Sequence, residues 1–332
     1  MSVEAVGTAT VSAIQAREPG GPEVLTEAEF ELPPLMDGQV RVRVTYAGVN
    51  YWDVMQREGK VPFNDTRIPG VEGTGVVSAV AADVDEPAPG TRVAWGKVPA
   101  SYAQQVQGDA SSFVVVPAEV TDEVAAAVLM QGVTAGFLRE AAPLLGTGGV
   151  ACVLAAAGGV GGLLTQLLVA DGIRVCGVVS RADKVAHARS FGAETVLVDD
   201  DDLVDQLREA YPAGVDALFD GNGGPQVPRA FELLAPRGTL VVFGTAAGPL
   251  PSIELDELGR GSFSVTRVAG KHFGGDAATW RRRAEAIFER VRAGELAPHV
   301  DEVFALKEAA AAHERLESRR SRGKLLLRAS GG

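Results

Sequence analysis

The sequence predicts an α/β protein in which a doubly wound parallel sheet domain accompanies a separate β-barrel domain. Short strands separated by Gly, Pro and Asp fill about the first 125 of the 332 residues. An alanine-rich helical pattern then begins at Asp122, and beyond it strands and helices alternate along the chain. Many short strands with frequent turns are typical of an antiparallel barrel, whereas alternating strands and helices build a parallel sheet.

The barrel part is recognised by short strands that lie between turn residues. In QVRVRV, apolar and polar residues alternate, as they do in a strand with one buried face. The other apolar runs are bounded by Gly, Pro or Asp, which commonly end strands. The expected strands are Val40–Val44, Val71–Val80, Thr91–Trp95 and Phe113–Val116.

The later part of the chain predicts the parallel sheet and its helices. After a helix over Asp122–Leu138, the expected strands are Val150–Ala155, Arg174–Val179, Thr195–Val198, Ala217–Phe219 and Thr239–Phe243. The helices between them are expected at Val160–Asp171, Asp183–Phe191 and Pro225–Leu234. A helix over Ala277–Gly294 and a strand over Gly323–Leu327 are expected to return to the barrel. The resulting domain limits are 1–130 and 273–332 for the barrel domain and 131–272 for the sheet domain.

The composition limits the possible partners. The chain has 31 Lys and Arg against 43 Asp and Glu, a net charge of −12. Because such a surface repels phosphate-rich polymers and anionic lipid, we expect neither a nucleic acid nor a membrane as a partner. Cys152 and Cys176 lie in apolar runs and are too few for a structural zinc site of thiolates. Since no secretory signal or bilayer-spanning apolar run is recognised, a cytoplasmic protein is expected.

The strongest local signal is the glycine turn AAAGGVGG at Ala155–Gly162. It follows an apolar strand and opens an apolar helix, which is the context of the dinucleotide-binding fingerprint of the Rossmann fold. The residues expected to meet the cofactor pyrophosphate are Gly158, Gly159, Val160 and Gly161. Ala156 replaces the first glycine of the fingerprint, which the turn accepts if Ala156 keeps a negative φ. A tight turn that binds nothing is the simpler alternative.

The end of the next strand indicates which cofactor is bound. Enzymes that use NAD usually carry Asp or Glu there for the ribose hydroxyls, whereas this chain reads SRADK from Ser180. Ser180, Arg181 and Lys184 are expected to surround the 2′-phosphate of NADPH, although solvated helix residues are the alternative. The acidic pair Asp199–Asp200 would oppose this assignment unless its carboxylates point away.

Six segments, taken in order, match one family. They are AGVNYWDVMQREG at Ala47–Gly59, GVEGTGVV at Gly70–Val77, LMQGVTAG at Leu129–Gly136, the glycine turn, LAPRGTLVVFGTAAG at Leu234–Gly248 and ESRRSRGKLLL at Glu317–Leu327. The chain resembles the medium-chain dehydrogenase/reductase superfamily, and within it the zinc-free quinone oxidoreductases, or zeta-crystallin-like group. The resemblance implies a Rossmann doubly wound parallel sheet domain plus a GroES-like β-barrel catalytic domain. It also implies a homodimer.

The resemblance implies chemistry without zinc. Where metal-dependent relatives hold a Cys, a His and a third ligand, this chain holds Asn50, Val71 and Gln131, and Glu72 alone does not make a zinc site. Without a Lewis acid, hydride is best accepted by a conjugated system that spreads the charge to a distant oxygen near a hydrogen-bond donor. We therefore expect an NADPH-dependent reductase of a small quinone or α,β-unsaturated carbonyl.

The resemblance also assigns residues to the site. Asn50 stands in the place of a metal-binding thiolate and is expected to face the substrate. Tyr51 and Lys271 are further candidates for the catalytic donor. Besides the glycine turn and the strand end, the residues expected around the cofactor are Gln131, Thr134, Asn222, Phe243, Gly244, Phe273 and Lys324, the last as a contact of its phosphates. No residue is expected to bind a metal.

Two other functions stay open from the sequence. An enoyl or tailoring reductase of a secondary-metabolite, polyketide-type pathway would carry the same motifs. A protein that binds NADPH without turnover would keep the glycine turn but lack an effective proton donor.

Overall fold

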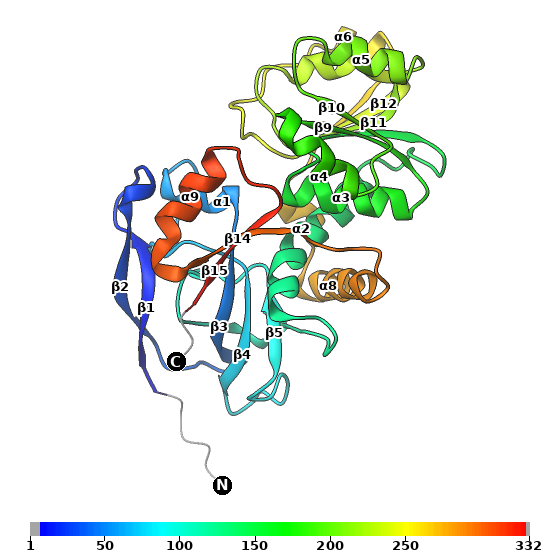
Figure 1. The fold of residues 1–332 in the computed structure, drawn as a ribbon. Helices are drawn as coiled ribbons and strands as arrows, with labels where there is room; N and C mark the ends of the chain where they lie inside the picture. Colours follow the sequence, from blue (N-terminus) through cyan, green and yellow to red (C-terminus); the bar gives the residue numbers. More distant parts are fainter. Residues whose placement is uncertain (1–6, 330–332) are drawn as a thin grey trace. The chain divides into compact units, whose positions relative to one another are not determined.

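The computed structural model describes residues 7–329, apart from the side chain of residue 271. Within this range the chain forms two compact units (Figure 1). Unit 1 holds the residues up to Met130, Asp276–Arg292 and those from Pro298 onward, and unit 2 holds Gln131–Gly275 and Ala293–Ala297. The chain passes from unit 1 to unit 2 inside helix α2 (Asp122–Glu140).

Unit 2 is built on a parallel sheet whose strand order is β10-β9-β8-β11-β12-β13. In chain order this is the 3-2-1-4-5-6 arrangement of the dinucleotide-binding fold, and the order reverses between β8 and β11. Helices α3 (Gly159–Ala170) and α4 (Val185–Ser190) lie on one face, and α5 (Leu203–Ala210) and α6 (Leu255–Gly259) on the other (Figure 1). The strands are β8 (Val150–Leu154), β9 (Arg174–Val179), β10 (Thr195–Val198), β11 (Val215–Asp220), β12 (Leu234–Val242) and β13 (Ser264–Arg267).

The centre of this sheet is apolar on both faces. Cys152 on β8 lies beside Cys176 on β9, and both side chains are fully buried. The hydrogen bond with Cys176 and the burial raise the pKa of the Cys152 thiol well above its ordinary value. Both thiols therefore behave as small apolar side chains, as their sequence context indicates.

Unit 1 contains a mostly antiparallel sheet in the order β14-β15-β3-β4-β5-β7, with β6 also paired to β3. The long strand β3 contacts β4, β6 and β15, and its end registers Val49 against Leu325 of β15. A segment near the C-terminus is thereby placed beside Asn50. The strands are β3 (Gln39–Val49), β4 (Gly73–Val80), β5 (Arg92–Trp95), β6 (Gln105–Asp109), β7 (Val114–Val115), β14 (Val300–Ala305) and β15 (Lys324–Arg328).

The expected elements are largely found, and the exceptions have local causes. The helix expected over Pro225–Leu234 is only the 3-10 helix η4 (Val227–Glu232), and β12 already begins at Leu234. Proline near the start of η4 removes a backbone donor that a longer α-helix would need. The antiparallel pair β1 (Ala9–Ala16) and β2 (Leu25–Leu32) was not expected, because the acidic residues of LTEAEFEL obscure its strand pattern.

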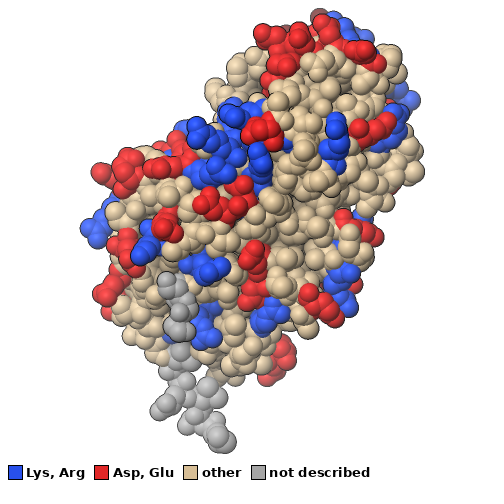
Figure 2. All heavy atoms as spheres, in the orientation of Figure 1, with Lys and Arg blue, Asp and Glu red and all other residues tan. Residues whose placement is uncertain are grey.

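The charged side chains are distributed over both units. Figure 2 shows Lys and Arg interspersed with Asp and Glu on the visible face. Among the described residues, no helix combines the length and apolar character that a membrane crossing requires.

Candidate active site and cofactor-binding turn

The glycine turn connects the end of β8 to the start of α3. Gly158 precedes the helix with φ −84° and ψ 171°, and its amide N–H donates to the Ala155 carbonyl at 2.8 Å. The positive φ of the turn, 55°, falls on Ala155, and Ala156 keeps a negative φ. The substitution of the first fingerprint glycine is therefore accommodated as the sequence analysis required.

The glycines of the turn differ in how much room a side chain would have. A Cβ on Gly161 would lie 2.4 Å from the Ala155 carbonyl oxygen, so this glycine is required for close helix–strand packing. A Cβ on Gly158 would meet only the same oxygen, at 3.2 Å, which leaves the front of the turn open. Gly159 faces the Gln131 carboxamide, whose Oε1 would be 2.0 Å from an added Cβ. The structure thus brings Gln131 of α2 to the turn; Thr134 is half-buried on the same helix.

The residues predicted to recognise the 2′-phosphate differ in exposure. Ser180 and Arg181 are exposed at the end of β9, and Arg181 Nε lies 3.0 Å from the Asp183 carboxylate. Lys184 is instead buried, with 6% exposure, at the start of the following helix. Lys184 is therefore not an exposed cation as Arg181 is, and its contact with the 2′-phosphate stays a prediction. The Asp200 carboxylate accepts hydrogen bonds from the Asp202 N–H and the Gln206 amide, so it points toward α5.

The ends of β11 and β12 meet in a turn that is held by Asp220. This buried carboxylate accepts the N–H groups of Asn222 at 2.8 Å and Gly223 at 2.9 Å, while burial raises its pKa. The Phe243 ring packs over Gly221. Gly244 lies so close to the Gly221 carbonyl that no side chain would fit there. The predicted Asn222, Phe243 and Gly244 therefore lie together, and Asp220 is an organising residue that the sequence analysis missed.

Two predicted residues lie on the short helix α7 (Gly270–Phe273). The Phe273 ring packs against Phe137 of α2, with ring centroids 5.8 Å apart. The Lys271 side chain lies outside the described part of the structure, so its catalytic role stays a prediction.

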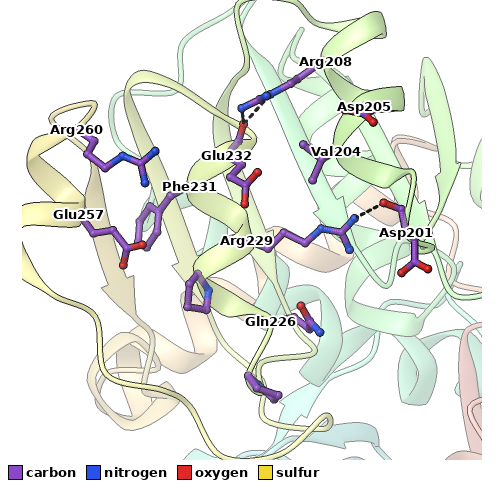
Figure 3. A pocket seen from close by; sticks show the side chains of 12 residues that line it. Asp201, Val204, Asp205, Arg208, Gln226, Arg229, Phe231, Glu232, Glu257 and Arg260 are labelled. Atoms are coloured by element: carbon purple, nitrogen blue, oxygen red, sulfur yellow. Dashed lines mark hydrogen bonds between the residues drawn. The ribbon is translucent and has the colours of Figure 1, made fainter.

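A shallow hollow of about 600 Å³ lies elsewhere on unit 2, between α5, η4 and α6 (Figure 3). Arg229 donates to the Asp201 carbonyl at 3.0 Å, and Arg208 to the Glu232 carbonyl at 3.2 Å (Figure 3). These arginines are engaged by the backbone, and the hollow contains none of the residues predicted for the site.

In unit 1, Asn50, Glu72 and Lys324 form one hydrogen-bonded cluster. Lys324 Nζ donates to Asn50 Oδ1 at 2.9 Å, to the Val49 carbonyl at 3.2 Å and to Glu72 Oε1. Asn50 Nδ2 donates to Glu72 Oε1 at 2.6 Å. Lys324 and Glu72 are each 1% exposed, whereas Asn50 is half-buried. Because a lysine ammonium has three N–H donors, these bonds occupy all of them. This geometry does not support the expected contact of Lys324 with cofactor phosphates.

Helix α1 (Tyr51–Arg57) begins immediately after Asn50. Tyr51 is half-buried, and Trp52 is 46% exposed. At the other end of the helix, Arg57 makes two hydrogen bonds of 2.9 Å to the Glu317 carboxylate. This pair ties α1 to α9 (Ala309–Glu317), which fixes the helix that carries Tyr51.

Beneath Asn50 lies a buried chain of polar groups that the sequence analysis missed. Asp53 Oδ2 accepts the Asn50 backbone N–H at 2.9 Å and the Tyr102 hydroxyl at 3.1 Å. The same hydroxyl lies 3.1 Å from His313 Nε2. Burial raises the pKa of Asp53 to about 7 and lowers the pKa of His313 to about 3. Around pH 6 the folded protein therefore holds a protonated Asp53 and a neutral His313.

The two pKa shifts make the stability of the fold depend on pH in opposite directions. The raised pKa of Asp53 gives stability that is complete below 3.8 and is lost as the pH rises through about 7. The lowered pKa of His313 gives stability that is complete above 6.5 and is lost as the pH falls toward about 3. Between pH 3.8 and 6.5 the pH dependences of the two contributions cancel, because unfolding releases one proton and binds another.

We predict that substituting either residue alone makes the pH dependence contributed by the other residue visible in the free energy of unfolding. In Asp53→Asn the free energy of unfolding should increase with pH relative to wild type, by up to about 1.4 kcal/mol per pH unit. In His313→Gln it should decrease by a similar amount. Urea unfolding between roughly pH 5.2 and 6.2 measures both slopes, and the double variant should regain the wild-type slope. If the free energy of unfolding of either single variant changes with pH as it does in wild type, these ionisation states are wrong.

The cluster in unit 1 differs from a metal centre. Among residues 7–329, side-chain positions do not bring three or more His, Cys, Asp or Glu together as a metal site. The carboxylate of Glu72 is paired with the Lys324 ammonium. The polar group that Asn50 offers is a carboxamide, which donates hydrogen bonds through its N–H groups.

Comparison with known proteins gives the family. The family model described as alcohol dehydrogenase GroES-like domain matches residues 36–171, and that described as zinc-binding dehydrogenase matches residues 159–289. The quinone oxidoreductase of Pseudomonas aeruginosa is 32% identical over 95% of this chain and 98% of its own. The 2-haloacrylate reductase of a Burkholderia species is 30% identical over 96% and 98%.

A solved structure of the same group of enzymes is also similar to this chain. The structure of Escherichia coli quinone oxidoreductase complexed with NADPH superposes with a TM-score of 0.90. It shares 29% identity and covers 97% of this chain and 100% of its own. The predicted fold, a Rossmann sheet domain with a GroES-like domain, is confirmed. The chain belongs to the medium-chain dehydrogenase/reductase superfamily, in which it is an enzyme of the quinone oxidoreductase group.

Proposed function

We propose that this enzyme reduces a quinone or an α,β-unsaturated carbonyl with NADPH and without zinc. The observation that carries the proposal is the open glycine turn at Gly158 beside a strand end that exposes Ser180 and Arg181 instead of a carboxylate. The Escherichia coli relative, complexed with NADPH, supports the cofactor.

The residues present fit this cofactor. The backbone N–H groups at the start of α3 suit the pyrophosphate, and Arg181 suits the 2′-phosphate. When bound, NADPH supplies a hydride from its nicotinamide ring. The Asp200 carboxylate points toward α5, and this orientation supports the assignment of the 2′-phosphate. Ser180 and Gln131 complete the set of polar groups near the turn and strand end.

The polar groups of unit 1 support a conjugated substrate. An isolated ketone is a poor hydride acceptor unless a metal ion or an acidic donor polarises it, whereas a conjugated acceptor places the developing charge on a distant oxygen. We assign the Asn50 amide as the donor to that oxygen. The two relatives, a quinone oxidoreductase and a 2-haloacrylate reductase, are both named for conjugated acceptors.

Arg181 should determine the preference for NADPH. We expect Arg181→Ala to raise the KM for NADPH about 10- to 50-fold, since a charge-assisted contact to the 2′-phosphate is lost. The KM for NADH, which lacks that phosphate, should stay within about twofold. Arg174→Ala is the matched control, because Arg174 is an exposed arginine at the opposite end of β9 and pairs with Glu194. Equal loss for both cofactors would contradict the assignment.

The proposal is tested by following the absorbance of NADPH with chelator-treated protein and a panel of quinones, enones and acrylates. Consumption that persists after metal removal is expected. Oxidation limited to enoyl substrates would favour the tailoring reductase, and binding without oxidation by any acceptor would favour a non-catalytic protein. Loss of activity on chelation, regained with zinc, would contradict the mechanism.

The homodimer also stays a prediction. β13 forms an edge of the parallel sheet, and an edge strand can pair with another chain. Light scattering in solution would measure the mass of the assembly.

A further inference from the structure

The buried ion pair of Lys324 and Glu72 carries a role beyond the chemistry described above. We propose that these two side chains are positioning residues, which lock the Asn50 carboxamide in one orientation and keep one of its N–H groups for the substrate oxygen. The use of that N–H rests on the proposed function, whereas the locking of the amide does not.

The donors and acceptors around Asn50 permit only one orientation. Asn50 Oδ1 accepts from Lys324 Nζ at 2.9 Å, and Nδ2 donates to Glu72 Oε1 at 2.6 Å. Rotation of the amide by half a turn would place its oxygen against the carboxylate and its NH₂ against the ammonium. Both contacts would then be repulsive in a buried setting, where charges are poorly screened.

One N–H group remains after these bonds are made. The Asn50 NH₂ has two N–H donors, and among the described residues only the Glu72 carboxylate accepts from it. Since Asn50 is half-buried and the ion pair is 1% exposed, Asn50 is the residue of the cluster that solvent reaches. The remaining N–H is therefore the group available to a ligand.

The backbone of Asn50 is fixed as well. Its N–H donates to Asp53 Oδ2 at 2.9 Å, and the preceding Val49 is paired with Leu325. With both the main chain and the side chain held, the donor needs no rearrangement when charge develops on the substrate. Preorganised donors of this kind contribute strongly to catalysis.

The pair also holds itself in place. Lys324 and Glu72 are buried charges that are satisfied by each other, by Asn50 and by the Val49 carbonyl. Removing one of them would leave the other buried and unpaired, which strongly destabilises proteins. A test must therefore remove both charges together, as in Lys324→Met/Glu72→Gln.

The orientation of the amide can be observed without enzyme activity. The asparagines of the chain are Asn50, Asn64 and Asn222, so ¹⁵N-asparagine labelling gives a very simple side-chain amide spectrum. The two side-chain NH₂ signals that disappear in Asn50→Ala are those of Asn50. In wild type we expect widely separated proton signals for the Asn50 NH₂, with the proton bound to Glu72 shifted downfield. In Lys324→Met/Glu72→Gln a neutral amide, which can pair with the Asn50 carboxamide in either orientation, replaces the carboxylate, so the separation should decrease. Lys60→Met, which removes an exposed lysine, should leave the separation unchanged.

Kinetics then connects the orientation to the reaction. With NADPH and a quinone, Lys324→Met/Glu72→Gln should lower kcat about 30-fold and leave the KM for NADPH within about twofold. In an Asn50→Ala background the same double substitution should cause little further loss, because it acts through Asn50.

Each result decides the proposal. An unchanged Asn50 amide signal overturns it, as does a raised KM for NADPH with an unchanged kcat, which would indicate a phosphate contact. Additive losses in the Asn50→Ala background overturn it too. If the wild-type enzyme oxidises no NADPH with any acceptor, the proposed function fails, and the amide signals still decide whether the pair orients Asn50.

Discussion

Gly158→Val should weaken the binding of NADPH by at least about 100-fold and leave the fold intact. The extended backbone of Gly158 is allowed for any residue, and an added Cβ would meet only the Ala155 oxygen, at 3.2 Å. The valine methyl groups would instead occupy the open front of the turn, where we expect the pyrophosphate. Titration of the cofactor, with thermal unfolding of the free protein as a check, measures both effects.

Gly146→Val is the matched control for this variant. Gly146 precedes β8 at its amino end, and a Cβ there would have no atom within 4 Å. The control should bind NADPH as wild type does. If Gly158→Val binds NADPH with unchanged affinity, the glycine turn is not the pyrophosphate site.

Asn50→Ala should lower kcat about 100-fold with little change in the affinity for NADPH. The substitution removes the carboxamide that we assign as donor to the substrate oxygen, while Lys324 and Glu72 can still pair with each other. The Asn50 backbone bond to Asp53 does not involve the side chain, so α1 should keep its start. Steady-state kinetics with a quinone and direct cofactor titration separate the two quantities.

Tyr51→Phe identifies the donor by comparison. Tyr51 is the neighbouring candidate, and this variant removes only its hydroxyl group. We expect a loss in kcat of less than about fivefold. A large loss in Tyr51→Phe together with a small loss in Asn50→Ala would transfer the donor role to Tyr51.

The fold and the cofactor turn could be predicted because their signals are local. Gly158, Gly159 and Gly161 follow one strand and open one helix, so a short stretch of sequence contains the whole motif. The alternation of strands and helices likewise reports the parallel sheet directly. Exposure was harder to predict: Arg181 and Lys184 look alike in sequence, yet only Lys184 is buried.

The cluster around Asn50 could not be predicted because its members are distant in the chain. Lys324 is 252 residues from Glu72 and 275 from Val49, and the pairing of β15 with β3 brings them together. Tyr102 and His313 are separated by 211 residues. Lys324 lies in an arginine-rich segment, and such a lysine resembles a phosphate contact when the strand pairing is not known. The sequence analysis therefore predicted Lys324 as a contact of the cofactor phosphates.

The transfer of deuterium from NADPH to an enone is the most direct test of hydride transfer by this enzyme. With NADPH labelled at C4 on one face or the other, we predict that one of the two cofactors yields a product with a single deuterium on the β-carbon, after chelator treatment of the protein. Mass spectrometry of the product, with NMR to locate the label, makes the measurement. A reduced product without deuterium from either cofactor, or no product from any conjugated acceptor, would contradict direct hydride transfer by this enzyme.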